Sequence, residues 1–366
     1  ILNKKIKNSN YVNNIYFLIN ECKDVGTRPF AGIARTAFIA TSLLNDLKKL
    51  KLIDNSELIN FYSSIKSITK NLNRDLRLLN KNISYKKNFL LKYGHLRPST
   101  YSISSKNYKE GFKEYFKHSE LNQENFNSNN KKLFKNKLKI DKLLKKNKLK
   151  LNFQNLIKIS EEAIYMREYS KYLFTKYLDL VFKNLINLSK KININRKDLE
   201  YISIKTILES YNNLSIEKLE NILKDEIKKS KKMFSITRAI RLPEVIKDEN
   251  DVFIFEQITK SGNFITEKSV TSKKYFLKNL NEKNIFKNCN KKIVIIENAD
   301  PGYDFLFNFN ISGLVTKYGG ANSHMAIRCS ELNIPAVIGV GEKKFDELNN
   351  YQIININCLS KNIEGL

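Results

Sequence analysis

Apolar residues recur every three or four positions through the first two-thirds of the chain, which is the spacing of helices with one buried face. Glycine and proline are scarce there, and Pro98 is the only proline between Pro29 and Pro243. Ser215 stands where a residue capping the last helix is expected. We therefore predict a mainly α-helical N-terminal region. The pattern places its helices within residues 31–50, 56–79, 156–188 (two helices or one bent helix) and 204–229.

Two segments interrupt this helical pattern. Residues 93–100 contain Gly94 and Pro98, which indicate a loop between helices. Residues 122–150 are rich in asparagine and lysine and contain few apolar residues. Such a composition is typical of segments that bury too little apolar surface to fold, so we predict a flexible insertion there.

The pattern changes near Pro243 to short apolar runs, which indicate buried strands. Strands that alternate with helices are typical of an α/β domain, here of about 115 residues. We place the boundary near residue 248, so the two predicted domains are 1–247 and 248–366. The expected strands are 252–255, 292–297, 314–316, 336–338 and 351–356, with a short helix at 323–332.

The net charge of +28 raises the possibility of a nucleic-acid partner. Only ten of the 65 basic residues are arginines, although arginine is the residue that reads bases and phosphates through paired hydrogen bonds. The lysines are spread along the chain, as on a solvated surface. We predict no nucleic-acid partner. The alternative is a basic helical protein that binds nucleic acid or acts as a scaffold without catalysis.

Targeting signals and metal motifs are not apparent. No apolar run approaches the roughly 20 residues that span a bilayer, and no apolar segment of a signal peptide follows the first residues. The four cysteines have neither metal-ligand spacing nor the density of a disulfide framework. We predict a cytoplasmic protein with no membrane partner and no metal. The chain begins with Ile1 and not with methionine, from which we expect a fragment or a processed product.

The candidate chemistry lies in residues 313–341, which contain five of the twelve glycines. A predicted strand ends at Thr316. The pair Gly319 and Gly320 follows, and glycines permit a turn with unusual dihedral angles and close approach of the backbone. The glycines therefore mark a stretch of backbone with special conformational demands, although a glycine pair before a helix is also common in ordinary turns.

A helix is predicted to begin directly after this turn, with Asn322 or Ser323 as its cap and His324 in its first turn. The first amides of a helix lack partners within the helix and carry partial positive charge, so they stabilise a phosphate. Neutral imidazole is a competent nucleophile near neutral pH. We predict that His324 carries a phosphate; the alternative is a structural or surface histidine.

Several neighbours of His324 are expected to stabilise that phosphate. Arg328 lies one helical turn further on and can reach the same face. Hydroxyl, amide and backbone donors complete the predicted set, which is Thr316, Gly319, Gly320, Asn322, Ser323 and Arg328.

The same stretch resembles the signature of the mobile phosphohistidine domain of phosphoenolpyruvate-utilising enzymes, which include phosphoenolpyruvate synthase, pyruvate phosphate dikinase and the rifampin phosphotransferases. Many members have threonine where this chain has Asn322. The resemblance implies that 248–366 is a swivelling α/β domain and that His324 is its phosphorylated residue. The matching residues are Gly319-Gly320, Ser323-His324, Ala326-Ile327, Glu331-Leu332, Ile334-Pro335-Ala336-Val337 and Gly339.

The resemblance also implies an ATP-dependent phosphotransferase of the dikinase type. In the family, an ATP-grasp domain transfers the β-phosphate of ATP to the histidine and releases AMP and phosphate. We expect that domain before residue 1, and ATP and Mg²⁺ are implied through it; this chain by itself is expected to bind neither and to be inactive. The acceptor is a small molecule such as pyruvate, with water, a sugar or a drug-like hydroxyl also open.

The predicted loop 93–100 carries a second candidate site. A histidine and an arginine in a loop, here His95 and Arg97, can hold a phosphate or an acidic acceptor. The alternative is a turn in which His95 packs and Arg97 pairs with a carboxylate. A cluster of Glu161, Glu162, Arg167 and Glu168 falls on a predicted helix, where ion pairing across a turn is the common explanation.

Overall fold

The computed structural model describes residues 10–98, 100–116, 134–211, 215–240, 242, 246–253, 262–277, 285–299, 301–321 and 323–366. Its α-helices are α2 (Tyr11–Glu21), α3 (Arg28–Lys49), α4 (Asn55–Ser64), α5 (Ile68–Lys81), α6 (Lys86–Tyr93), α7 (Phe112–Phe116), α8 (Lys137–Lys146), α9 (Phe153–Lys191), α10 (Ile204–Glu209), α11 (Ile216–Ala239), α12 (Ile285–Cys289), α13 (His324–Glu331) and α14 (Glu342–Leu348). A π-helix, η1 (Cys22–Thr27), joins α2 to α3, and the 3₁₀-helices are η2 (Ile83–Tyr85), η3 (Arg196–Tyr201), η4 (Glu249–Val252) and η5 (Pro301–Asn308). The strands are β1 (Asn263–Ile265), β2 (Ser269–Phe276), β3 (Ile293–Asn298), β4 (Gly313–Tyr318), β5 (Ala336–Ile338), β6 (Ile353–Asn357) and β7 (Asn362–Gly365).

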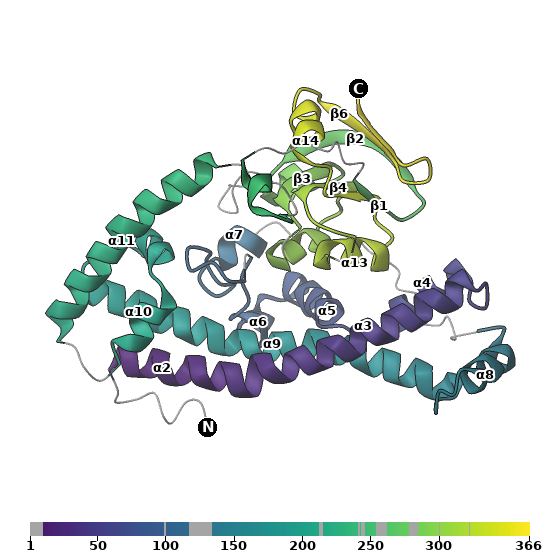
Figure 1. Ribbon diagram of the computed structural model, residues 1–366, viewed down its shortest axis with the longest axis horizontal. Coiled ribbons are helices and arrows are strands. Elements are labelled where there is room, and N and C mark those ends of the chain that lie inside the picture. Colours follow the sequence, from purple (N-terminus) through teal and green to yellow (C-terminus); the bar gives the residue numbers. More distant parts are fainter. Residues whose placement is uncertain are drawn as a thin grey trace.

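Two long helical rods form the base of the helical region (Figure 1). One is the continuous run of α2, η1 and α3, and the other is α9, whose 39 residues span about 58 Å. Helix α2 packs on the C-terminal half of α9, where Ile15 contacts the cluster that contains Leu185. Helix α3 packs on the N-terminal half, where Leu44 and Leu156 share a second cluster. The two rods are therefore antiparallel, and the predicted stretch 156–188 is one helix.

The remaining helices cover these rods. The predicted stretch 56–79 is divided into α4 and α5, because Ser67 caps α5 and the chain is extended at Ile65. The stretch 204–229 is divided into α10 and α11, and Ser215 caps α11 through its side chain, as predicted. Helices α5, α6 and α7 enclose an aromatic cluster around Tyr93 and Phe116.

The flexible insertion predicted at 122–150 is wrong for its second half. Residues 117–133 lie outside the described residues, but Lys137–Lys146 is the helix α8. Its Ile140 and Leu144 are buried against α9. These two apolar residues are four positions apart, so one narrow face of a lysine-rich helix is enough to hold it on the core. Average composition did not reveal that face.

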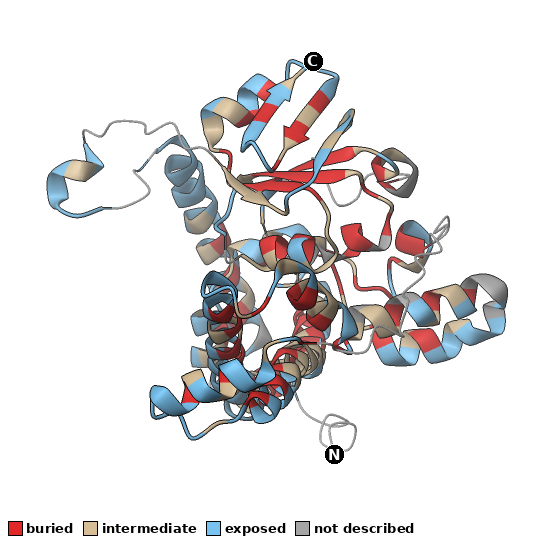
Figure 2. Cartoon of the chain, turned by 90° about the vertical axis from the view of Figure 1, so that its right-hand side faces the viewer, coloured by how far each residue is buried: buried red, intermediate tan, exposed pale blue. Residues whose placement is uncertain are grey.

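The C-terminal region is a curled mixed sheet of seven strands in the order β1-β5-β4-β3-β2-β6-β7. Strands β2, β3, β4 and β5 are parallel to their neighbours within the centre, whereas β1, β6 and β7 pair antiparallel at the two ends. Strands β3, β4 and β5 are buried along most of their length, as Figure 2 shows. The strands expected at 292–297, 314–316, 336–338 and 351–356 are confirmed within one or two residues.

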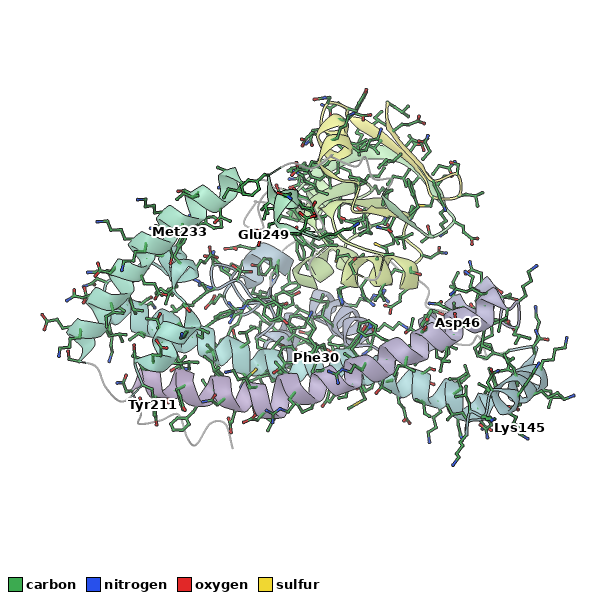
Figure 3. All side chains as sticks on the ribbon, viewed as in Figure 1. Phe30, Asp46, Lys145, Tyr211, Met233 and Glu249 are labelled. Atoms are coloured by element: carbon green, nitrogen blue, oxygen red, sulfur yellow. The ribbon has the colours of Figure 1, made fainter. Side chains whose placement is uncertain are left out.

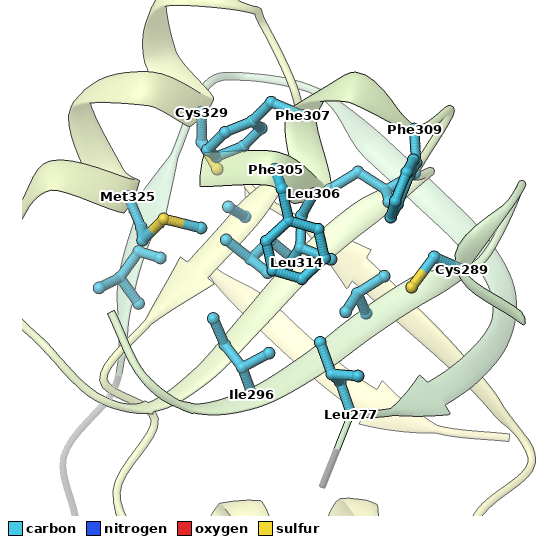
Figure 4. Packing of buried hydrophobic residues seen from close by; sticks show 14 of the residues in the cluster. Leu277, Cys289, Ile296, Phe305, Leu306, Phe307, Phe309, Leu314, Met325 and Cys329 are labelled. Atoms are coloured by element: carbon cyan, nitrogen blue, oxygen red, sulfur yellow. The ribbon is translucent and has the colours of Figure 1, made fainter. Parts of the chain in front are cut away.

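Both faces of the sheet are covered, which explains why its central strands are apolar without alternation. Val294, Ile296 and Leu314 face η5 and α13, and Figure 4 shows this core with Phe305 and Leu306 at its centre. The intervening residues face α14 and the β6–β7 hairpin on the other side; they are Ile293, Ile295, Val315 and Val337.

The strand predicted at 252–255 is wrong at its first two residues. Val252 ends the 3₁₀-helix η4, and Phe253 follows it as a turn. The cause is Asp248, whose side chain accepts a hydrogen bond from the N–H of Asn250 at 2.7 Å and starts a helical turn. Residues 254–255 lie outside the described residues, and the boundary at 248 stays a prediction.

The contact between α3 and α9 gives a test of the helical core. Leu44→Ala removes a fully buried side chain and leaves a cavity, so we expect the free energy of unfolding to fall by about 2–5 kcal/mol. Ile39→Ala on the same helix is the control, because Ile39 is 62% exposed and its loss should change stability by less than about 0.5 kcal/mol. Urea unfolding followed by circular dichroism measures both. Equal effects of the two changes would contradict this packing.

Candidate phosphohistidine site

One buried hydroxyl fixes the turn that follows β4. Thr316 is fully buried, and its Oγ1 donates to the carbonyl oxygen of Tyr318 at 3.0 Å and accepts from the N–H of Gly339 at 2.9 Å. The carbonyl oxygen of Thr316 accepts from the N–H groups of Gly339 and Val340, each at 3.0 Å. A threonine hydroxyl has a single hydrogen to donate. In this arrangement Thr316 shapes the loop, and the phosphate contact predicted for it would need that hydrogen to turn away from Tyr318.

Two glycines, Gly319 and Gly339, approach each other closely beside this hydroxyl, and we call this contact the glycine crossing. Gly319 has φ +141° and Gly339 has φ +73°, which are conformations that side chains disfavour. A Cβ on Gly339 would lie 2.2 Å from the carbonyl oxygen of Gly319, and a Cβ on Gly319 would lie 2.6 Å from the Cβ of Ala299. At Gly320, by contrast, no described atom lies within 4 Å of where a Cβ would stand. Gly319 is thus required by packing, whereas Gly320 leaves open space beside the turn.

Helix α13 begins immediately after this turn, and His324 is its first residue. Ser323 is the cap, since its Oγ accepts from the N–H of Ala326 at 3.3 Å and its backbone is extended. Of the two caps that the sequence left open, the structure uses Ser323; Asn322 lies outside the described residues. His324 is half-buried and is the first residue of the helix, at the end where the first amides carry partial positive charge.

The other face of α13 holds the helix on the sheet. Met325, Ala326 and Cys329 are buried in the core beneath η5, as seen in Figure 4. Because these residues fix the rotation of α13, His324 and Arg328 lie on the side that faces away from the sheet. The position of His324 is therefore set by the sheet, by the glycine crossing and by the cap together.

Arg328 is placed differently from the prediction that it holds phosphate. Its Nη1 lies 2.6 Å from Oε2 of Glu331 on the same helix and 3.9 Å from Oε1 of Glu168 on α9. The residue is only 4% exposed. Its guanidinium is therefore engaged by carboxylates in this structure. Glu168 could not be predicted as a partner of Arg328, because the two residues are 160 positions apart along the chain.

The comparison with known families concerns this part of the chain. Residues 289–361 match the model of the family described as PEP-utilising enzyme, mobile domain. The chain carries a PEP-utilising enzyme mobile domain. The match includes β3, β4, α13, β5, α14 and β6, and thus the whole frame around His324. It confirms the resemblance drawn from the sequence and indicates a family of phosphotransfer enzymes.

Among curated proteins, none matches the chain. The family match begins at residue 289, so it does not extend over the helical region. In the parts of the chain that the structure describes, no helix combines the length and apolar character needed to cross a membrane.

The second candidate site, His95 and Arg97, lies far from the mobile domain's histidine in sequence and is largely buried. Nη2 of Arg97 lies 2.6 Å from Oδ1 of Asp179 on α9, and both side chains are almost fully buried. Asn107 donates to the same carboxylate oxygen at 2.8 Å, and Lys183 lies 2.6 Å from the other one. This is the alternative arrangement, a turn whose arginine pairs with a carboxylate.

His95 is part of the same packing. Its Nε2 lies 3.1 Å from the carbonyl oxygen of Tyr172, which can only accept, so Nε2 carries hydrogen and donates. Its ring also meets the ring of Tyr172 edge-on, with centroids 5.0 Å apart. Burial of the ring lowers the pKa of His95 to about 4, which the hydrogen bond to Tyr172 only partly opposes. A second proton on this ring is therefore disfavoured near neutral pH, and the imidazole of His95 is neutral there.

The glycine crossing gives a test within the mobile domain. Gly339→Ala places a Cβ against the carbonyl oxygen of Gly319 at a positive φ, so we expect a loss of on the order of 2–3 kcal/mol of stability. Gly320→Ala is the matched control, because its Cβ would enter open space. Thermal unfolding of the two variants measures the difference. If both lower the melting temperature equally, the crossing does not carry the packing described here.

The buried histidine gives a test by pH. Since the unfolded chain binds a proton near pH 6.5 and folded His95 only near 4, the stability that the neutral ring contributes is complete above about pH 6.5. It is lost as pH falls toward 4, by on the order of 2–3 kcal/mol. His95→Gln should remove this part of the acid sensitivity. Urea midpoints between pH 7.5 and 4.5 measure it, and parallel pH curves for the two proteins would contradict the burial of His95.

Proposed function

We propose that this chain is the carrier and acceptor-side part of an ATP-dependent phosphotransferase, in which His324 accepts a phosphate and passes it to a small molecule. The single observation that carries the proposal is the place of His324. It is the first residue of a capped helix, directly after a glycine turn, within a PEP-utilising enzyme mobile domain. The proposal is of the dikinase type, like phosphoenolpyruvate synthase.

The chemistry needs a nucleophile and a stabilised anion. A ring nitrogen of neutral His324 attacks phosphorus, a nitrogen–phosphorus bond forms, and the bond from phosphorus to the leaving oxygen breaks. The phosphoryl group then lies beside the amides at the start of α13, where partial positive charge favours it. Ser323 supports this arrangement, because its side chain caps the helix by accepting from the N–H of Ala326 and so fixes where the helix begins. The open space beside Gly320 gives the phosphoryl oxygens room.

The donor in this proposal is ATP, bound with Mg²⁺ by an ATP-grasp domain that acts on His324. The β-phosphate goes to the ring, AMP leaves, and the γ-phosphate is released to water. In the second half-reaction the phosphoramidate bond breaks and an acceptor oxygen takes the phosphoryl group. Pyruvate is the acceptor that the dikinase reading favours, and a hydroxyl compound or water fits the same donor chemistry.

Replacement of His324 tests the carrier role. With an ATP-grasp domain present and ATP labelled at the β-phosphate, the protein should take up label that is lost in acid and retained in alkali. His324→Gln should lower this uptake by at least about a hundredfold, because no other nucleophile replaces the ring. His95→Gln is the matched control and should retain the label, since His95 is buried against Tyr172. Acid-labile label that survives in His324→Gln would contradict the proposal.

A further inference from the structure

The polar side of α13 is turned toward the helical region, where Arg328 meets Glu168 of α9. Residues at positions i, i+4 and i+7 share one side of a helix, so His324, Arg328 and Glu331 lie in one row. The apolar side of α13 packs on the sheet, and the row with these polar residues is turned toward α4 and α9. Figure 1 shows α13 between the sheet and the helices of the N-terminal region.

The helical region brings two charged residues to this contact, Glu168 of α9 and Lys70 of α5, and its helix α4 contacts α13 directly. Glu168 of α9 lies 3.9 Å from Arg328, and their side chains are 13% and 5% exposed. Lys70 of α5 donates to the carbonyl oxygens of Ser63 and Ile65 at the C-terminal end of α4. The C-terminal end of a helix carries partial negative charge, which holds the ammonium group of Lys70 in place.

Helix α4, which carries Tyr62, contacts α13, and the ammonium of Lys70 lies at the C-terminal end of α4. Burial lowers the pKa of Lys70, while the carboxylates of Glu331 and Glu168 oppose that shift and Arg328 adds to it. Burial raises the pKa of Tyr62 on α4 to about 12, and the charge of Glu331 contributes. The contact is therefore an electrostatic one between the mobile domain and the helical region, with both signs of charge on both sides.

We infer that the surface formed by Tyr62, Lys70 and Glu168 is the docking station at which the helical region receives the mobile domain, with Glu168 and Arg328 as the ion pair that joins them. This inference rests on the proposed function for its meaning, because docking there turns the phosphate-carrying side of α13 toward the acceptor side. It assigns to the helical region a place in the reaction that the family match does not cover.

The chemistry of this contact suits a reversible interface. Burial of an ion pair costs hydration that its mutual attraction repays only in part, so such a contact adds specificity without strong net attraction. On separation Arg328 keeps Glu331, 2.6 Å away on its own helix, so its charge stays paired after Glu168 has left. An apolar contact of the same size would offer no comparable partner in the separated state.

The experiment measures the distance between the two parts of the chain without nucleotide or phosphate. Spin labels are placed at Lys145→Cys on α8 and Lys361→Cys beside β7, both exposed, with the half-buried Cys22 changed to serine. Figure 3 shows Lys145 at the outer end of the helical region. Pulsed electron paramagnetic resonance then gives the distribution of distances between the two labels in the docked and separated molecules.

Glu168→Lys replaces the ion pair by a like-charge contact with Arg328 and should raise the ratio of separated to docked molecules on the order of tenfold. Glu168→Gln keeps the shape, removes only the charge and should shift the ratio in the same direction by less. Glu162→Lys is the matched control, because Glu162 is exposed on the same helix and undergoes the same change of charge.

An unchanged distribution in both Glu168 variants, or an equal shift in Glu162→Lys, overturns the docking station. Helix content measured by circular dichroism shows that each variant is folded, and Glu168→Gln preserves the test if Glu168→Lys is not. The measurement does not depend on phosphate transfer. If the distances do not change, the uptake of label by His324 is still to be judged by its own experiment. If His324 takes no label, the measured distances remain valid.

Discussion

The start of helix α13 is the point on which the rest of the structure depends. Its position follows from close contact between two loops, in which Gly339 approaches Gly319 and donates a hydrogen bond to the buried hydroxyl of Thr316. A side chain at either glycine would separate the loops. The parallel strands β4 and β5 deliver these loops to one edge of the sheet, and the helix that begins there presents His324 where backbone amides favour an anion.

The two sides of α13 make different kinds of contact. Its apolar side belongs to the core with Phe305 and Leu306, which makes the helix an integral part of the sheet region. Its polar side meets the helical region through Arg328 and Glu168. Apolar packing thus holds the helix in its own domain, whereas its contact with the neighbouring region is an ion pair. The proposed reversible docking requires this arrangement of strong and weak contacts.

The sequence predicted the parts of the fold in which local pattern and burial agree. The runs at 293–296 and 336–338 are apolar because both faces of the sheet are covered, and Ser323 and Ser215 cap helices as their chemistry suggests. Helix α8 was missed because only Ile140 and Leu144 join the core.

At the candidate site, the sequence identified His324 and its turn, but not the partners of the two arginines. Arg97 finds Asp179 and Arg328 finds Glu168 only after distant helices have packed together. Local spacing carries no information on such pairs. It equally gives no sign that Thr316 donates its hydrogen to the backbone of the same loop.

The central claim is that the imidazole of His324 carries the phosphate. Tandem mass spectrometry of the protein charged by its ATP-grasp domain and ATP, digested and separated at alkaline pH, locates the group directly. The account predicts a gain of one phosphoryl group on the peptide that contains Ser323 and His324, with fragment ions that assign it to the ring. A phosphoryl group on the Ser323 hydroxyl or on another residue, with His324 unmodified, would contradict it.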